Sequence, residues 1–169
     1  MDRRIGASEE DVLVTQSNLA STYQELGQFE KVMCLRRDVY FGSLRLEGKE
    51  SNDTLLEANN YALSLVRLQR FEETKALLRK TMPVARDVLG ESHDVTLRIR
   101  WTYACALIDD PGATLDDLRE AVGTLEAVAK LWKRVMGERH PEMAKVQSAL
   151  ATVREKLADA RVSESKPPP

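Results

Sequence analysis

The chain has 169 residues, which is enough for one domain with a buried core. Its residues are 43% hydrophobic and 31% charged, a composition typical of globular proteins. A formal net charge of −2 at pH 7 gives no field that would attract nucleic acid or an anionic membrane. No apolar run approaches the roughly 18 residues of a membrane-spanning helix, and no secretory signal follows Met1. The default expectation is a cytoplasmic protein without membrane insertion.

The two cysteines, Cys34 and Cys105, lack the number and spacing of a disulfide framework or a metal knuckle. Each falls inside a helical pattern, so we expect small core or groove residues of a protein in a reducing compartment. No cofactor or metal is expected.

An internal repeat organises the chain. Residues 16–32, QSNLASTYQELGQFEKV, return at residues 58–74 as ANNYALSLVRLQRFEET, with identical residues displaced by 42 positions. Gly6, Gly48 and Gly90 share this offset. Gly48 and Gly90 follow long helical stretches, where glycine closes a helix. Gly137 repeats the role after 47 residues, which places a five-residue insertion in residues 109–117, DDPGATLDD. A fixed period of this length predicts stacked helical units.

The helical pattern predicts three helix pairs and a final helix, with no strand-like alternation. In chain order, the expected helices are residues 9–26, 29–47, 51–68, 71–89, 92–108, 115–136 and 141–160. About three repeats, residues 9–50, 51–91 and 92–139, and a C-terminal capping helix would form one domain over residues 4–161. A flexible Pro-rich tail is expected at residues 162–169. Pro83 lies inside the fourth helix and predicts a kink or a break there.

Three sets of repeated positions resemble the tetratricopeptide pattern. They are small residues at Ala20, Ala62 and Ala104; an aromatic or leucine at Tyr23, Leu65 and Leu107; and a large residue after the turn at Phe29, Phe71 and Leu118. The 42-residue period, the run Asn59-Asn60-Tyr61-Ala62, and the segments LGESHD (89–94) and MGERHP (136–141) resemble the longer repeats of the kinesin light chain group. The resemblance covers about residues 6–157. It departs where Val32 and Thr74 replace alanine, where Gln69 replaces the turn glycine, and at the insertion.

The resemblance implies a right-handed solenoid whose concave face, lined by the first helix of each pair, binds other proteins. The groove positions of the second and third pairs are unusually apolar, and exposed patches of this kind mark partner sites. Trp101 is the best single anchor. The alternative is that neighbouring repeats or the final helix fill this surface and that Trp101 belongs to the core. The expected groove residues are Asn18, Leu56, Asn59, Asn60, Leu63, Val66, Arg67, Arg98, Trp101, Cys105, Ile108 and Lys145.

The resemblance also suggests a ligand. Asn18 and Asn60 match positions where the family binds the backbone of an extended peptide, although such asparagines also hold adjacent helices together. Arg67, Arg98 and Lys145 would suit an acidic or tryptophan-acidic peptide. The groove is nevertheless mixed in sign, because Glu25, Asp109 and Glu155 lie at similar positions.

Catalysis finds no support in the motifs. His93 and His140 occupy equivalent places in the repeat, which favours caps or inter-repeat contacts over a general base. The aspartates at 109, 110, 116 and 117 lack the spacing of a calcium loop. The leading hypothesis is a non-catalytic adaptor that binds a peptide or helix of a partner protein. The main alternative is a structural subunit or spacer of a larger assembly; an enzyme is the third.

Overall fold

The computed structural model describes residues 8–138 and 141–164, and these residues form seven helices and no strand. In chain order, they are α1 (Glu9–Glu25), α2 (Phe29–Glu47), α3 (Asn52–Arg67), α4 (Phe71–Leu89), α5 (Asp94–Asp109), α6 (Leu115–Met136) and α7 (Pro141–Glu164). The first six begin and end within two residues of the predicted bounds. The helix α7 continues to Glu164, so the expected tail at 162–169 starts too early, and residues 165–169 lie outside the described part.

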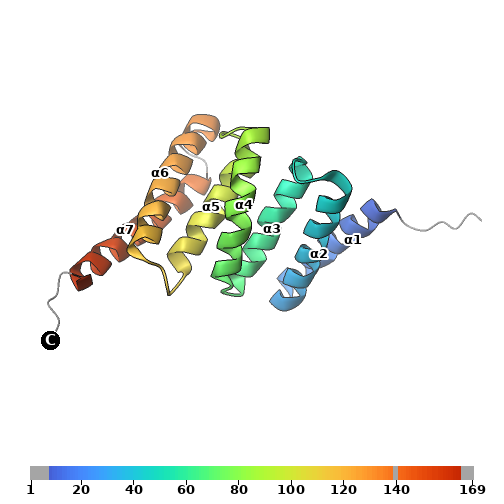
Figure 1. Ribbon diagram of the computed structural model, residues 1–169, viewed down its shortest axis with the longest axis horizontal. Helices are drawn as coiled ribbons and strands as arrows, with labels where there is room; N and C mark the ends of the chain where they lie inside the picture. Colours follow the sequence, from blue (N-terminus) through green and yellow to red (C-terminus); the bar gives the residue numbers. More distant parts are fainter. Residues whose placement is uncertain (1–7, 139–140, 165–169) are drawn as a thin grey trace, which may run out of the picture.

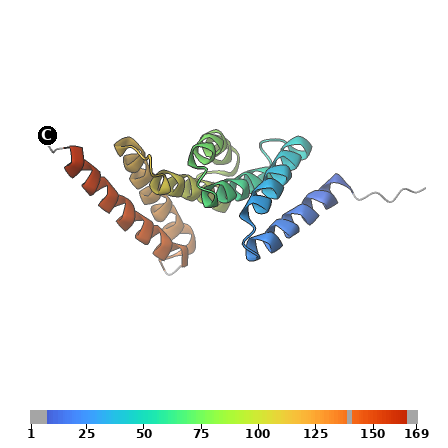
Figure 2. The ribbon, with the colours of Figure 1, turned by 90° about the horizontal axis from the view of Figure 1, so that it is seen from below.

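The helices form a row of hairpins (Figure 1). Each helix packs against the next one in the chain, and α3 packs in addition against α5. Seen from below, α4 lies on one side of the row while α1 and α7 extend toward the other (Figure 2). The predicted all-α solenoid of helix hairpins is therefore confirmed. No helix of the described residues is long and apolar enough to cross a lipid bilayer.

Polar side chains begin the first helices of the later hairpins. The hydroxyl of Ser51 accepts the N–H of Asp53 at 3.2 Å and caps α3. His93 caps α5 in the same way, because its Nδ1 accepts the N–H of Val95 at 3.3 Å. The expectation that this histidine is a cap is confirmed. The equivalent His140 lies outside the described residues.

The second helices end at the repeated glycines. Gly48, Gly90 and Gly137 have φ angles of 84°, 92° and 83°, a conformation that a side chain would strain. The turn inside the first hairpin uses Gly27 with a φ of 69°, and Gln69 adopts a φ of 58° at the equivalent place in the second. The second hairpin therefore keeps the turn geometry without the glycine.

The insertion forms a tied loop between α5 and α6. The carboxylate of Asp110 accepts the N–H of Gly112 at 2.8 Å and a hydrogen bond from the buried Lys75 of α4 at 2.7 Å. Thr114 then starts α6 through a capping box with Asp117. Asp110, Thr114 and Asp117 therefore act as turn and cap residues. No group of side chains suited to a metal occurs among the described residues.

The break considered at Pro83 is wrong, because α4 runs without interruption through this residue. Pro83 is exposed, so its ring faces solvent, and the missing N–H removes a single backbone hydrogen bond. In α2, Gly42 is buried beneath Leu13 of α1, and a β-carbon there would overlap the leucine side chain. Gly42 therefore allows α1 and α2 to approach closely.

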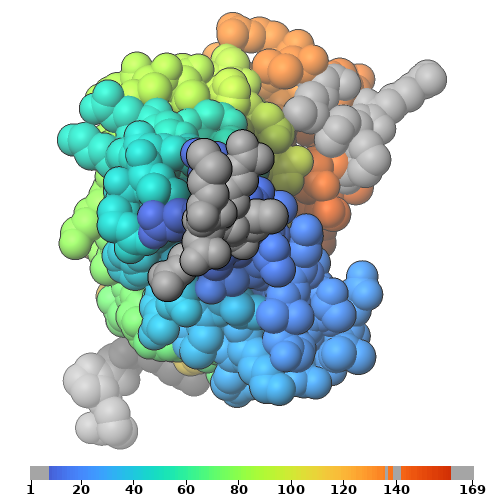
Figure 3. Space-filling view, turned by 90° about the vertical axis from the view of Figure 1, so that its right-hand side faces the viewer, coloured from blue at the N-terminus to red at the C-terminus, as the bar shows by residue number. Residues whose placement is uncertain are grey.

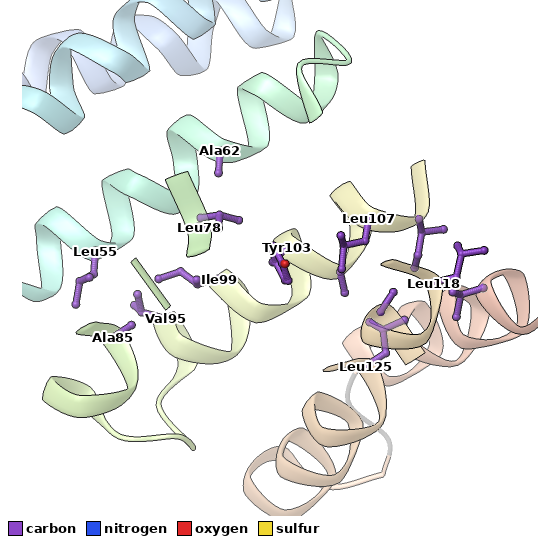
Figure 4. Close-up of a cluster of buried hydrophobic side chains, with 14 residues drawn as sticks. Leu55, Ala62, Leu78, Ala85, Val95, Ile99, Tyr103, Leu107, Leu118 and Leu125 are labelled. Atoms are coloured by element: carbon purple, nitrogen blue, oxygen red, sulfur yellow. The ribbon is translucent and has the colours of Figure 1, made fainter. Parts of the chain in front are cut away.

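The main hydrophobic core runs from α3 to α7. Figure 4 shows Leu78, Ile99, Tyr103 and Leu125 among its buried members. The alanines at 20, 62 and 104 are fully buried, as the repeat predicts. In contrast, Ala20 is the only buried residue of α1, which is fully described. The N-terminal helix therefore contributes little to the core.

Candidate protein-binding groove

Three hollows lie along the first helices of the hairpins. Hollow I, of about 510 Å³, opens between α1, α2 and α3. Hollow II, of about 400 Å³, is lined by α1, α2, α3 and α5, and hollow III, of about 480 Å³, by α5 and α7. Hollows II and III share Cys105 and Asp109, so the two adjoin. Together they form the candidate groove.

The candidate groove is mainly apolar. Leu63 and Val66 of α3 line hollow II, and Trp101 of α5 lines hollow III. Leu63 is an exposed side chain on a helix whose opposite face is core, which leaves it free to contact a ligand. An apolar concave surface with a few polar groups is the usual composition of a binding site.

Trp101 packs on the core and also lines hollow III. Its ring lies 6.1 Å from that of Trp132 at an interplanar angle of 43°, and it packs against both hydrophobic clusters. It is half-buried, and it also lines hollow III. Trp101 is therefore a rigid wall of the groove that is anchored in the core.

Cys105 lies where hollows II and III meet. Burial raises the pKa of its thiol to about 12, with a smaller contribution from the carboxylate of Asp109. The thiol is therefore protonated and unreactive at neutral pH, and it contributes a small, weakly polar contact surface. Cys34, by contrast, is exposed on α2, so the expectation of a core or groove residue is wrong for this cysteine.

The polar residues of hollows II and III are already held in place. The guanidinium of Arg67 lies 4.9 Å from the ring centre of Phe29. Asn60 donates to Glu57 at 3.2 Å, and Lys145 donates to Glu142 at 2.8 Å. All three predicted residues line a hollow.

Three of the predicted groove residues are buried between helices or lie outside the hollows. Asn59 is 3% exposed and accepts a hydrogen bond from Thr102 at 2.8 Å, so it joins α3 to α5 and cannot reach a ligand. Ile108 is buried in the main core, although it touches hollow III. Arg98 is exposed, pairs with Asp94 at 2.6 Å and lies outside the lining of the three hollows.

Hollow I differs from the others in charge. It contains the predicted Asn18 and Leu56. Its lining also includes four acidic residues: Glu10, Glu47, Asp53 and Glu57. An acidic peptide would be repelled at this end, so the predicted ligand charge does not suit the whole concave face.

Sequence reasoning missed an ion pair between hollows I and II. Arg36 of α2 lies 3.6 Å from Glu57 of α3, and both side chains are largely buried. Arg36 also donates to the hydroxyls of Ser17 and Ser21 of α1, at 2.8 and 3.2 Å. One guanidinium thus bridges the first three helices.

The repeat contains a signal for this pair. Leu78 follows Arg36 by 42 residues, and Ile99 follows Glu57 by 42 residues. Leu78 and Ile99 are fully buried core residues. The contact between the first and second hairpins therefore carries two opposite charges where the contact between the second and third carries two aliphatic side chains.

Comparison with known proteins supports the repeat architecture. The family model described as a tetratricopeptide repeat matches residues 58–94, from α3 to the start of α5. No curated protein matches the sequence. Among solved structures, the crystal structure of BtubC (BKLC) from P. vanneervenii is similar, with 15% sequence identity and a TM-score of 0.49, over 99% of this chain and 70% of that chain.

Proposed function

We propose that the chain is a non-catalytic scaffold or adaptor of the tetratricopeptide, kinesin light chain-like type, with residues 4–161 acting as one domain. Tetratricopeptide repeats generally mediate protein–protein interactions, and the matched segment contributes Leu63, Val66 and Arg67 to the candidate groove. The two free cysteines of the chain, Cys34 and Cys105, suit a protein of the reducing cytoplasm.

The observation that carries the proposal is the adjoining pair of hollows II and III. Their lining combines exposed Leu63 with the anchored ring of Trp101. A rigid aromatic wall loses little conformational freedom when a ligand binds, which favours affinity. A peptide or a short helix of a partner protein is the ligand that fits such a surface.

The charges around the hollows favour one direction for this ligand. Arg67 lines hollow II and Lys145 lines hollow III, so acidic residues of the ligand would lie beside these two side chains and away from Asp109, where the hollows meet. An aromatic residue of the ligand would lie against Trp101. The acidic lining of hollow I would instead attract a basic residue at the α1 end. The proposed motif is therefore acidic and aromatic over most of its length, with a basic end.

Peptide selection tests this proposal. A random-peptide phage library panned on the wild-type protein should yield acidic, aromatic sequences, and a synthetic selected peptide can be titrated by calorimetry. We expect Leu63→Glu to weaken binding by about tenfold or more, while Val88→Glu, an equally exposed site on α4, leaves it unchanged. Selection of the same peptides by wild type and Leu63→Glu would contradict the proposal.

A structural subunit of a larger assembly is the second candidate function. It is favoured by the large exposed apolar side chains. Of the nine such side chains among the described residues, six belong to the first hairpin: Val12, Val14, Leu19, Leu26, Phe41 and Leu46. Exposed apolar surface of this size suits permanent burial against another chain. A purified chain that precipitates or self-associates unless a partner is present would favour this function over the adaptor.

A further inference from the structure

The outward face of α1 carries an exposed apolar stripe. Val12, Leu19 and Leu26 are spaced by seven residues, so they lie on one side of the helix, and they are 43%, 41% and 63% exposed. On the same side, the hydroxyls of Thr15 and Thr22 donate to carbonyls of their own helix, at 2.8 and 3.3 Å. This surface, the α1 stripe, therefore offers few free polar groups.

The two later hairpins show how the equivalent face is covered. Leu19 corresponds to Tyr61 of α3 and Tyr103 of α5, by the 42-residue period. Tyr61 stacks on Tyr40 of α2, with ring centres 6.1 Å apart. Tyr103 accepts a hydrogen bond from Arg79 of α4 at 3.0 Å. In both cases, the second helix of the preceding hairpin lies on this face.

The residues equivalent to Val12 confirm the pattern. Thr54 and Thr96 are 2% and 1% exposed, and Thr96 donates to the carbonyl of Ala85 in α4 at 3.2 Å. No described helix lies on the α1 stripe in this way. Figure 3 views this end of the molecule, where the surface of α1 and α2 faces the viewer.

The charge of α1 indicates the chemistry of a helix that would cover the α1 stripe. The helix contains four acidic residues and no basic one. Glu9, beside Val12, pairs with Arg45 of α2, and Asp11 forms the capping box with Ser8, whereas Glu25 lies beside Leu26 at the other end of the stripe. Each helix that covers the equivalent face carries an arginine there. Arg36 of α2 pairs with Glu57 of α3, and Arg79 of α4 donates to Tyr103 of α5. A helix that carries basic residues beside its apolar side complements both features.

We propose that the α1 stripe docks a basic amphipathic helix of a partner protein, which lies along α1 as α2 lies along α3. The interaction is a helix-on-helix contact with an apolar centre and an electrostatic rim. This surface is separate from the candidate groove, because Val12, Leu19 and Leu26 line none of the three hollows.

The second helix of the second hairpin supplies a probe. A fluorescent synthetic peptide of residues 70–90 has five Lys or Arg against three Asp or Glu. A hydrocarbon staple that joins positions 72 and 76, both exposed in α4, holds the short peptide helical. Its binding to the full chain is measured by fluorescence anisotropy, with the Leu78→Glu version of the peptide as the control probe.

We expect saturable binding that weakens about tenfold or more in the protein variant Leu19→Glu. Raising NaCl from about 50 to about 500 mM should weaken it several-fold. Val88→Glu, the matched exposed control, should bind as wild type does, and so should the groove variant Leu63→Glu. Circular dichroism establishes that each variant folds.

Four results would overturn the proposal. The first is no binding at millimolar peptide, and the second is equal binding by wild type and Leu19→Glu. The third is a dimer of the chain in light scattering that Leu19→Glu dissociates, because a second copy would then cover the α1 stripe. Loss of binding in Leu63→Glu alone would assign the peptide to the groove and also contradict the proposal.

Discussion

Successive hairpins meet at two equivalent joints. The first joint lies between the first and second hairpins, and the second joint lies between the second and third. Both follow the same repeat, yet different side chains fill them. At the first joint, Arg36 of α2 meets Glu57 of α3 at 3.6 Å. At the second, the equivalent positions hold Leu78 and Ile99, which are buried in the main core. There α3 packs directly against α5, whereas α1 and α3, both fully described, are not packed in this way and hollow I opens beside them.

The difference shows that one pair of positions can control how closely two hairpins of a repeat protein pack. An aliphatic pair gains from leaving water, so it draws the helices together. A charged pair loses hydration on burial, and it keeps its stability only with hydrogen-bond partners, here Ser17 and Ser21. The first joint is therefore more open and more polar, and this adds an acidic hollow to the concave face.

The largest effect should come from truncating the second joint. Leu78→Ala leaves a cavity in the main core and should reduce the free energy of unfolding by about 3 kcal/mol. The equivalent change in the first joint, Arg36→Ala, should cost about 1–2 kcal/mol, because it leaves Glu57 without its partner in a partly hydrated place. Urea unfolding followed by circular dichroism measures both. Equal losses would mean that the joints are energetically alike.

Transplanting the second pair into the first joint should have an intermediate effect of opposite sign. The double variant Arg36→Leu/Glu57→Ile replaces a buried ion pair with aliphatic side chains and should stabilise the chain by about 1–2 kcal/mol. Arg36→Leu alone should destabilise it, since one charge is then buried without a partner. The double-mutant cycle in urea gives the coupling energy. A double variant less stable than both single variants would refute the equivalence of the positions.

The smallest effect on stability should be its pH dependence in acid, which involves Asp110 in the loop between α5 and α6. The hydrogen bond from Lys75, and next the N–H of Gly112, lower the pKa of Asp110. Because the folded-state pKa is below the unfolded value, this pair stabilises the chain above that unfolded value, near pH 4. The stabilisation is lost as the pH falls through the folded pKa.

Lys75→Met should therefore flatten the decline in stability between about pH 5 and pH 2, by less than about 1 kcal/mol. Urea unfolding at a series of pH values measures the decline, and Lys80→Met, an exposed lysine on the same helix, is the control. An unchanged decline in Lys75→Met would show that the buried ammonium does not hold Asp110.

The sequence predicted the helices well because the period and the caps are local properties. The glycines at 48, 90 and 137 and His93 mark helix ends through the chemistry of single residues. Side-chain direction was harder to predict. Asn59 and Asn60 are neighbours in the sequence, and their side chains point about 100° apart around the helix. Asn59 therefore faces α5, where it bonds to Thr102, whereas Asn60 lines hollow II.

Charge also concealed part of the site. Arg36 and Glu57 resemble ordinary surface residues when each helix is considered alone. Alignment of the hairpins at the 42-residue offset places them over Leu78 and Ile99, and that contrast identifies them as interior residues. Pro83 does not break α4 for a related reason, since the effect of a proline in a helix depends on whether its ring faces solvent or core.

The polar first joint also has a mechanical consequence. In a linear stack, every hairpin is secured only by its immediate neighbours, so a stretched or heated array gives way at its weakest link. Here that link joins α2 to α3 through Arg36 and the stacked rings of Tyr40 and Tyr61, and α1 and α3 lack the direct packing that α3 and α5 have. The N-terminal hairpin should peel away first and reversibly, while α3 to α7 remain folded as a stable base from which it can reattach.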